Sequence, residues 1–297
     1  MDISTSTRPV VVGLDRSPHA TAALEHATAL AERRHLPLLL VNAYEPSQFD
    51  VRSTAGWSPD AAGVPRNVAE RLVDDAVDTL RAFHPAVEVR TKVEAGSAVQ
   101  LLIEESTRAS AIVLGSRGTG GFAELLLGST TLHLASHATC PVIAVPAPDP
   151  THPAGRGIVV GVDGSALSDS AMEYSFAEAA DLGEPLVAVH AWHDVTRTGV
   201  GRMMPLAFDP VEVADEQRLL LTESLAAWRD KFPDVEVVPK VVYGHPVPAL
   251  LRYAGKAGLL VVGCRGRGSV RSLLLGSVSH GVLHHATGAV AVVHSGC

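Results

Sequence analysis

The sequence contains little cysteine, and it has no long apolar run. Three cysteines occur in 297 residues, at Cys140, Cys264 and Cys297, and they are too few and too scattered for a disulfide framework or a CxxC zinc site. No apolar stretch approaches the roughly 18 residues that a membrane-spanning helix needs. The first residues also lack a basic segment followed by an apolar one. We therefore expect a soluble, cytoplasmic protein in a reducing compartment.

Positive charge and aromatic residues are scarce as well. Lys and Arg number 24 against 32 Asp and Glu, for a net charge of −8, which is the wrong sign for a broad basic surface that binds nucleic acid. Aromatic residues make up 4% of the chain, whereas hydrophobic residues make up 46%. This composition predicts a folded core of Ala, Val, Leu and Ile, with neither nucleic acid nor membrane as a partner.

The chain repeats itself with an offset of 148 residues. Val-Val-Gly-Leu-Asp-Arg-Ser at 11–17 aligns with Val-Val-Gly-Val-Asp-Gly-Ser at 159–165, and the same offset relates Leu-Leu-Leu-Gly-Ser at 125–129 to that at 273–277. An unbroken register over this length indicates two copies of one domain. We expect domains at 1–147 and 158–297, joined by a linker rich in proline and glycine at 148–157.

Within each copy, short β-branched runs alternate with longer amphipathic stretches. This pattern predicts an α/β fold of two tandem doubly wound domains, each a five-stranded parallel sheet of order 3-2-1-4-5 with helices on both faces. Such sheets bind ligands outside the carboxyl ends of the strands where the winding reverses, here between strands 1 and 4. The first copy has expected strands near 10–14, 38–43, 87–93, 111–115 and 142–145, and expected helices near 18–34, 66–83, 97–108 and 129–138, with the second copy following at the same offset.

A glycine-rich segment follows the fourth expected strand of each copy. Both segments read Gly-x2-Gly-x9-Gly-Ser and end where a helix is expected to begin. Glycines let the backbone approach a ligand, and the free N–H groups of a helix N-terminus favour an anion such as phosphate. None of the four lysines lies in a Gly-x4-Gly-Lys-Ser/Thr motif, so a P-loop is not expected. The residues of interest are Gly115, Gly118, Gly128, Ser129 and Thr130, and Gly263, Gly266, Gly276, Ser277 and Val278.

Each half resembles a universal stress protein domain, and the whole chain resembles the tandem two-domain members of that family found in actinobacteria. The likeness rests on the Val-Gly-x-Asp-x-Ser start, the glycine segment and the His-Ala-Thr-Cys-Pro-Val-Ile-Ala-Val ending at 137–145. It implies ATP as the ligand, with Mg²⁺. By the same resemblance, Asp15 and Asp163 approach the adenosine or a phosphate-bound metal, the backbone of Ala43 and Ala191 faces the adenine edge, and the glycine segments hold ribose and phosphates.

Simpler explanations of the same residues stay open. Asp15 and Asp163 can act as turn residues, the glycine segments as tight connections, and Arg117 and Arg265 as solvated charges rather than phosphate partners. The 14 histidines include i, i+4 pairs that could chelate a metal, but hydrogen-bonded or solvated histidine is the favoured interpretation.

The functional expectation is a nucleotide-dependent, stress-linked regulatory binding protein with at most weak ATP hydrolysis. The alternatives are a nucleotide-independent adaptor of the same fold and a slow ATPase. We expect the two domains to pair through their fifth strands as an intramolecular pseudo-dimer, with a homodimer as a further option. The segments 45–65 and 194–213 differ most between the copies and are the expected movable lids or partner surfaces.

Overall fold

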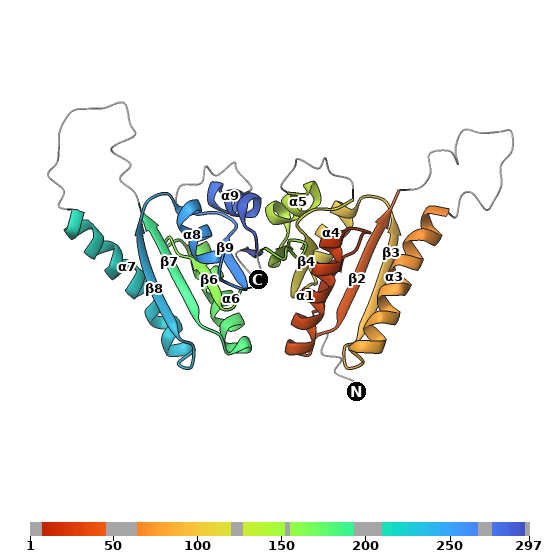
Figure 1. Cartoon of the computed structure of the whole chain (residues 1–297), viewed down its shortest axis with the longest axis horizontal. Helices are drawn as coiled ribbons and strands as arrows, with labels where there is room; N and C mark the ends of the chain where they lie inside the picture. Colours follow the sequence, from red (N-terminus) through yellow and green to blue (C-terminus); the bar gives the residue numbers. More distant parts are fainter. Residues whose placement is uncertain are drawn as a thin grey trace, which may run out of the picture. The chain divides into compact units, whose positions relative to one another are not determined.

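The computed structural model in Figure 1 describes residues 8–45, 64–119, 127–151, 155–192, 210–266 and 275–294. The segments expected to act as lids lie mostly outside these residues. The described chain divides into two compact units, one before Thr151 and one from Thr151 onward. Each unit is described here by itself.

The first unit alternates strands and helices as the sequence predicts (Figure 1). Helix α1 begins at Pro18, and the Ser17 hydroxyl before it accepts a hydrogen bond from the Ala20 N–H at 3.1 Å, so the serine and proline define its start. The elements are β1 (Val10–Gly13), α1 (Pro18–Arg34), β2 (Leu38–Tyr44), α3 (Val64–Phe83), β3 (Val89–Ala95), α4 (Ala98–Ser106), β4 (Ala111–Gly115), α5 (Ser129–His137) and β5 (Val142–Val145).

The second unit repeats this order. The Ser165 hydroxyl caps its first helix by accepting a hydrogen bond from the Ser168 N–H at 3.2 Å. The elements are β6 (Ile158–Gly161), α6 (Ala166–Leu182), β7 (Leu186–Trp192), α7 (Pro210–Lys231), β8 (Val237–Tyr243), α8 (Pro246–Ala254), β9 (Leu259–Gly263), α9 (Ser277–His285) and β10 (Ala289–Val293).

Each unit contains a five-stranded parallel sheet in the predicted order. In the first unit β1 pairs with β2 and β4, β2 pairs with β3, and β4 pairs with β5. In the second unit β6 pairs with β7 and β9, β7 with β8, and β9 with β10. The predicted fold class is therefore confirmed, and the winding reverses between β1 and β4 and between β6 and β9.

The central strands are buried because helices pack on both faces of each sheet. Helix α4 packs against α5, α6 against α7, and α8 against α9. The core of the first unit is aliphatic, as the composition predicts, and includes Val11, Val41, Leu102, Ile112 and Leu134. No helix among the described residues is long and apolar enough to cross a membrane.

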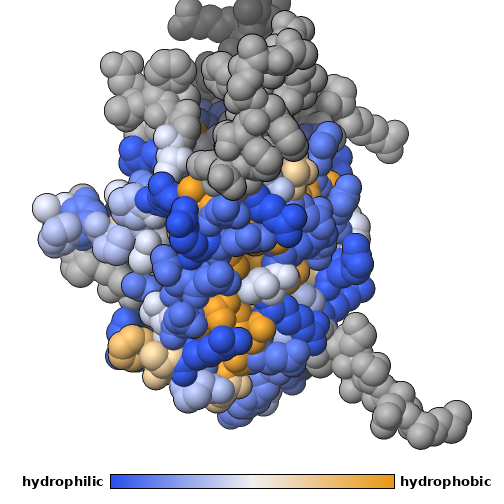
Figure 2. Space-filling view, turned by 90° about the vertical axis from the view of Figure 1, so that its right-hand side faces the viewer, coloured by the Kyte–Doolittle hydropathy of each residue, from blue (hydrophilic) through white to orange (hydrophobic). Residues whose placement is uncertain are grey.

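The strands β3 and β8 carry features that discourage edge pairing. Figure 2 views the first unit from the side of β3 and α3, and it shows a narrow apolar band within a largely hydrophilic surface. Strand β3 alternates uncharged residues with Arg90, Lys92 and Glu94. Strand β8 carries Pro239, which cannot donate a backbone hydrogen bond. Charge and proline on these strands oppose the addition of a further strand.

The expected strand at 87–93 is the one whose position changes. It lies at Val89–Ala95 and pairs in register with Leu38–Tyr44 of β2. The alternation of uncharged with charged residues runs from Val87 through Ala95, so it does not mark where the strand begins. Pairing with the buried strand β2, rather than its own pattern, sets its bounds.

Candidate nucleotide-binding site

The two aspartates after β1 and β6 each stabilise the turn into the next helix. The Ser17 N–H donates to Asp15 Oδ1 at 2.8 Å, and the Ser165 N–H donates to Asp163 Oδ1 at 2.9 Å. The turn role considered from the sequence is therefore present in both copies. Each turn engages one carboxylate oxygen of its aspartate, Oδ1.

The second carboxylate oxygen of each aspartate faces the glycine segment. Asp15 Oδ2 accepts a hydrogen bond from the Thr119 N–H at 3.0 Å. A Cβ atom placed on Gly118 would lie 2.6 Å from that oxygen, and one placed on Gly266 would lie even closer to Asp163 Oδ2. Real Cβ atoms do not approach an oxygen so closely, so a side chain at either position would force the carboxylate or the segment to move. The carboxyl ends of the first and fourth strands thus meet at one place in each unit.

The other glycines of the motif have structural roles that the sequence analysis did not assign. A Cβ on Gly115 would lie 2.7 Å from His19 Cβ, and one on Gly263 would lie 2.9 Å from the Leu167 carbonyl oxygen. These glycines therefore allow α1 and α6 to pack closely against the sheet.

The third glycine of each motif closes the loop. The Gly128 N–H donates to the Ser116 carbonyl and the Gly276 N–H donates to the Cys264 carbonyl, each at 2.7 Å. These two N–H groups are thus already engaged within the chain. The expectation that Gly128 and Gly276 hold a ligand can apply only to their remaining atoms and to their position before the helix.

The starts of α5 and α9 present unbonded N–H groups. Their N-cap residues are glycines, which have no side chain to cap the helix. The first intrahelical bonds come from the Leu132 N–H to the Gly128 carbonyl at 3.1 Å and from the His280 N–H to the Gly276 carbonyl at 2.9 Å. Within the described parts of the chain, the N–H groups of 129–131 and 277–279 have no acceptor. Together with the helix dipole, they favour an anion.

The hydroxyl group of the third residue in each of these helices bonds to the end of the fourth strand. Thr131 Oγ1 donates to the Gly115 carbonyl at 2.8 Å, and Ser279 Oγ donates to the Gly263 carbonyl at 2.6 Å. Both hydroxyls are buried. The helix start is therefore fixed relative to the strand end in both units.

Ala43 and Ala191 lie near the carboxyl ends of their strands. Each is the second-last residue of β2 or β7. The Val41 carbonyl accepts from the Leu14 N–H at 2.8 Å, and the Val189 carbonyl accepts from the Val162 N–H at 2.9 Å. Because backbone groups alternate direction along a strand, those of Ala43 and Ala191 point the same way, past the ends of β1 and β6. Strand β2 extends one residue further than predicted, to Tyr44.

A cavity of about 330 Å³ lies at the carboxyl edge of the second sheet. This volume is at the lower end of the range for small-molecule pockets. Val162, Val189, Leu250 and Val262 contribute apolar surface to it. All eight residues predicted for this copy line the cavity, namely Asp163, Ala191, Gly263, Arg265, Gly266, Gly276, Ser277 and Val278.

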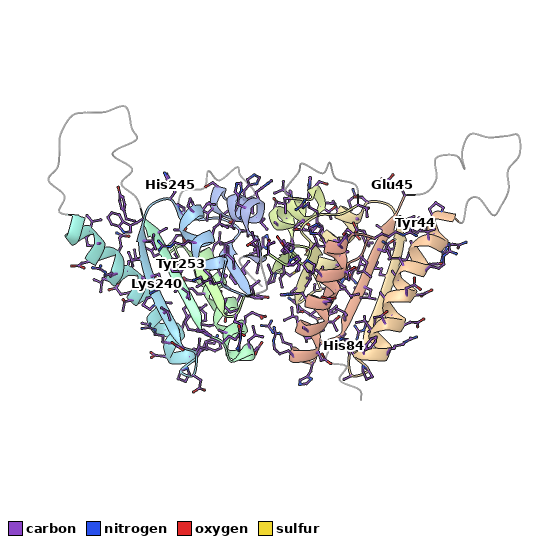
Figure 3. All side chains as sticks on the ribbon, in the orientation of Figure 1. Tyr44, Glu45, His84, Lys240, His245 and Tyr253 are labelled. Carbon is purple, nitrogen blue, oxygen red and sulfur yellow. The ribbon has the colours of Figure 1, made fainter. Side chains whose placement is uncertain are left out.

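The same edge can be located in Figure 3. Tyr44 and Glu45 mark the carboxyl end of β2 in the first unit, and His245, before α8, marks the corresponding edge of the second. In the first unit, Asp15, Gly118, Gly128 and the helix start are joined by the hydrogen bonds and close approaches described above. The predicted residues are thus brought together in each unit.

The two arginines differ in their surroundings. The Arg117 carbonyl accepts a hydrogen bond from the Ser17 hydroxyl at 3.3 Å. Arg265 lines the cavity, and its buried Nε has no hydrogen-bond acceptor among the described residues. Burying a guanidinium N–H without a hydrogen-bond acceptor costs free energy, and an anion in the cavity would supply that acceptor.

Cys264, next to Arg265, is not a reactive thiolate in this arrangement. Burial raises the pKa of its thiol, and the Arg265 guanidinium opposes that rise only in part. A buried thiol with a raised pKa stays protonated at neutral pH and is a poor nucleophile. Cys264 is therefore a packed small residue in this arrangement.

Sequence analysis missed two polar residues that hold the aspartate turns. Asn42 Nδ2 donates to the Leu14 carbonyl at 2.7 Å, and His190 Nδ1 lies 2.7 Å from the equivalent Val162 carbonyl. His190 Nε2 also lies 2.9 Å from Gln217 Oε1. Both Asn42 and His190 are buried in otherwise apolar strands at the repeat offset. A polar residue recurring at such a place is a signal from which these supports could have been found.

The histidine pairs are hydrogen-bonded within their own helices or have their rings in contact. His133 Nδ1 lies 2.9 Å from the Ser129 carbonyl, and His137 Nδ1 lies 2.9 Å from the His133 carbonyl. The His280 and His284 rings are 4.4 Å apart between centroids. No group of three or more metal-ligating side chains occurs in the described part of the chain.

Comparison with known proteins agrees with this architecture. The model of the universal stress protein family matches residues 6–146 and again 156–294. The universal stress protein Rv1996 of Mycobacterium tuberculosis is 34% identical over 95% of this chain and 94% of its own length. Rv2623 of the same organism is 35% identical over 98% of both chains. The crystal structure of a universal stress protein from Archaeoglobus fulgidus has a TM-score of 0.70 at 21% identity, covering 97% of this chain and 96% of its own. The chain belongs to the universal stress protein family, with two domains of that family in tandem.

Proposed function

We propose that each unit binds an adenine nucleotide, ATP with Mg²⁺, and that nucleotide occupancy controls a stress-linked regulatory activity. The observation that carries the proposal is the set of N–H groups at the starts of α5 and α9 that have no acceptor among the described residues and lie beside an aspartate and a glycine segment. Several such donors, held by the backbone, suit a polyphosphate better than a neutral ligand.

Charge supports the same assignment. The chain carries a net charge of −8, so an anionic ligand needs local positive potential to offset the repulsion. The helix N-termini supply part of it, and in the second unit the unpartnered Nε of Arg265 supplies more. Among the described residues that line the cavity, Asp163 carries the one carboxylate. Mg²⁺ would arrive with the nucleotide and neutralise phosphate charge, with Asp163 and the Ser277 hydroxyl as the oxygen-bearing side chains suited to it.

The geometry supports binding more than catalysis. Asp15 and Asp163 use one carboxylate oxygen in the turn, and Asp15 uses the other on Thr119. A phosphoryl-transfer enzyme needs a group that orients water or a hydroxyl, and these bonds leave the first-unit carboxylate occupied. We therefore propose regulation through occupancy, with weak turnover at most. The domain limits 1–147 and 158–297, and pairing of the two domains through β5 and β10, remain part of this proposal, as does a homodimer.

Mass spectrometry of small molecules released from the purified chain tests the function. We expect an adenine nucleotide at a substantial fraction of the protein concentration. A chain that releases none, and whose melting temperature is unchanged by added Mg·ATP, would be a nucleotide-independent adaptor. Turnover that is lost in Asp15→Ala and Asp163→Ala would instead identify an ATPase.

A further inference from the structure

His19 joins three segments of the first unit. It is the second residue of α1, and its Nδ1 accepts a hydrogen bond from the Ala147 N–H at 2.8 Å. The same nitrogen lies 3.1 Å from the Ser116 hydroxyl. His19 thus connects the start of α1, the first residue after β4 and the segment after β5.

Ser116 ties this contact to the glycine segment. Its N–H donates to the Val145 carbonyl, and its carbonyl accepts from the Gly128 N–H, both at 2.7 Å. That second bond closes the loop in front of the α5 N–H groups. A change in how His19 holds Ser116 and Ala147 therefore acts on the residues that position the proposed ligand.

The contacts require a neutral ring. An unprotonated Nδ1 can only accept, so the Ala147 N–H and the Ser116 hydroxyl both donate to its lone pair and the ring proton is on Nε2. Protonation of Nδ1 would turn it into a donor facing the Ala147 N–H, and the Ser116 hydroxyl oxygen would be the acceptor left to it. Burial and the Arg117 charge lower the pKa of His19 below its ordinary value, while the Asp15 charge opposes them.

The second unit has a different pair at these places. Leu167 and Cys264 stand where the first unit has His19 and Ser116. Neither is a histidine, and Cys264 is buried with a raised pKa. The two units therefore differ in a titratable contact although their backbone arrangement is repeated.

We propose that His19 is a positioning residue that clasps the glycine segment and the segment after β5 in the first unit while its ring is neutral. Protonation of Nδ1 releases Ala147 and reverses the Ser116 contact, which lies next to the loop-closing Gly128 bond, so ligand binding by the first unit weakens in acid while the second unit lacks this response. The clasp stands on the contacts of His19 alone, whereas the effect on ligand binding rests on the proposed nucleotide function.

The clasp is tested by NMR on the full-length chain. Between pH 7.5 and 5, the Ala147 amide resonance should shift with the same midpoint as the His19 ring, and that midpoint should lie below 6.5. The His19→Leu variant, which carries the residue of the second copy, should lose the shift. An Ala147 amide that does not follow the His19 titration would overturn the clasp.

The effect on ligand is tested by Mg·ADP titrations at pH 7.5 and 5.5 in two backgrounds. Gly266→Val weakens the site of the second unit, so its titration reports mainly on the first unit, and Gly118→Val reports mainly on the second. Protonation of the nucleotide itself affects both variants equally. We expect affinity in the first background to fall at least about fivefold more than in the second, and His19→Leu to remove the difference. Equal pH dependence in both backgrounds would refute the link to the ligand. If neither background binds at pH 7.5, the nucleotide function fails, and the NMR result still decides the clasp.

Discussion

Gly118 and Gly266 matter because a carboxylate lies where their side chains would be. A Cβ on Gly118 would come within 2.6 Å of Asp15 Oδ2. We expect Gly266→Val, and likewise Gly118→Val, to displace the aspartate and the glycine segment at a cost of about 1–3 kcal/mol. That corresponds to nucleotide binding about 5- to 150-fold weaker in the altered unit, measured by titration of the full-length chain.

Gly255→Ala is the matched control for these variants. A Cβ there meets one atom, the Leu251 carbonyl oxygen, at 3.7 Å, which is ordinary contact. Its nucleotide affinity should equal that of the original chain. An affinity in Gly118→Val and Gly266→Val equal to that of Gly255→Ala would contradict the role assigned to the two glycines.

Asn42 supports the turn that presents Asp15. Replacing it with leucine removes the donor to the buried Leu14 carbonyl, and an unsatisfied buried acceptor costs about 1–3 kcal/mol. We expect Asn42→Leu to lower the free energy of unfolding by that amount in urea denaturation and to weaken ligand binding in the first unit. Thr79→Ala, at an exposed position on α3, should change stability by no more than about 0.5 kcal/mol. An effect of Asn42→Leu no larger than that of Thr79→Ala would argue against the supporting role.

At the scale of elements, variants at the start of α9 can distinguish ligand binding by backbone N–H groups from ligand binding by side chains. Ser277 is the first residue of α9, and Gly276 before it has φ −73° and ψ 154°, a conformation that a residue before proline adopts readily. Proline at the first helical position preserves the helix but has no N–H. Ser277→Pro therefore removes one proposed phosphate donor with little effect on folding.

Ser277→Ala provides the comparison, because it removes the hydroxyl and keeps the N–H. A hydrogen bond to a charged group contributes about 1.5–3 kcal/mol. We expect Ser277→Pro to weaken nucleotide binding by the second unit about tenfold or more and Ser277→Ala to weaken it less, with similar melting temperatures for both. Equal losses in the two variants would assign the contact to the hydroxyl instead.

Elements were more predictable from the sequence than the tasks of individual residues. Buried strands such as β4 and β5 form apolar runs whose bounds match the prediction, because burial on both faces determines their composition. Strand β3 shifted because its alternating pattern begins at Val87, before the strand itself. The starts of α1 and α5 were predicted correctly, since Ser-Pro and Gly-Ser are local signals.

The three glycines of one motif have three different structural roles. Gly115 allows close helix packing, Gly118 leaves room for a carboxylate, and Gly128 closes the loop with its N–H. Glycine looks the same in sequence whichever reason applies, so the motif could indicate a site without assigning the contacts. The supporting bonds of Asn42 and His19 join residues far apart in sequence, at Leu14 and Ala147, and no local pattern reports them.

At the scale of the whole molecule, duplication has preserved the backbone arrangement and changed the side chains around it. The loop-closing bond, the turn bond of the aspartate and the hydroxyl bond to the fourth strand recur in both units. Ser116, His19 and Asn42 of the first unit correspond to Cys264, Leu167 and His190 of the second. Retention of the backbone donors in both copies is why we assign the ligand to them, and the changed surroundings suit two sites with different responses.

Calorimetric titration of the intact chain tests the central claim most directly. With Mg·ATP we expect saturable binding at two sites per chain, and with adenosine, which lacks the phosphates, much weaker binding, because the proposed donors face the polyphosphate. Absence of saturation for any adenine nucleotide up to about 1 mM, an affinity near −4 kcal/mol, would contradict the account, and so would an affinity for adenosine equal to that for Mg·ATP.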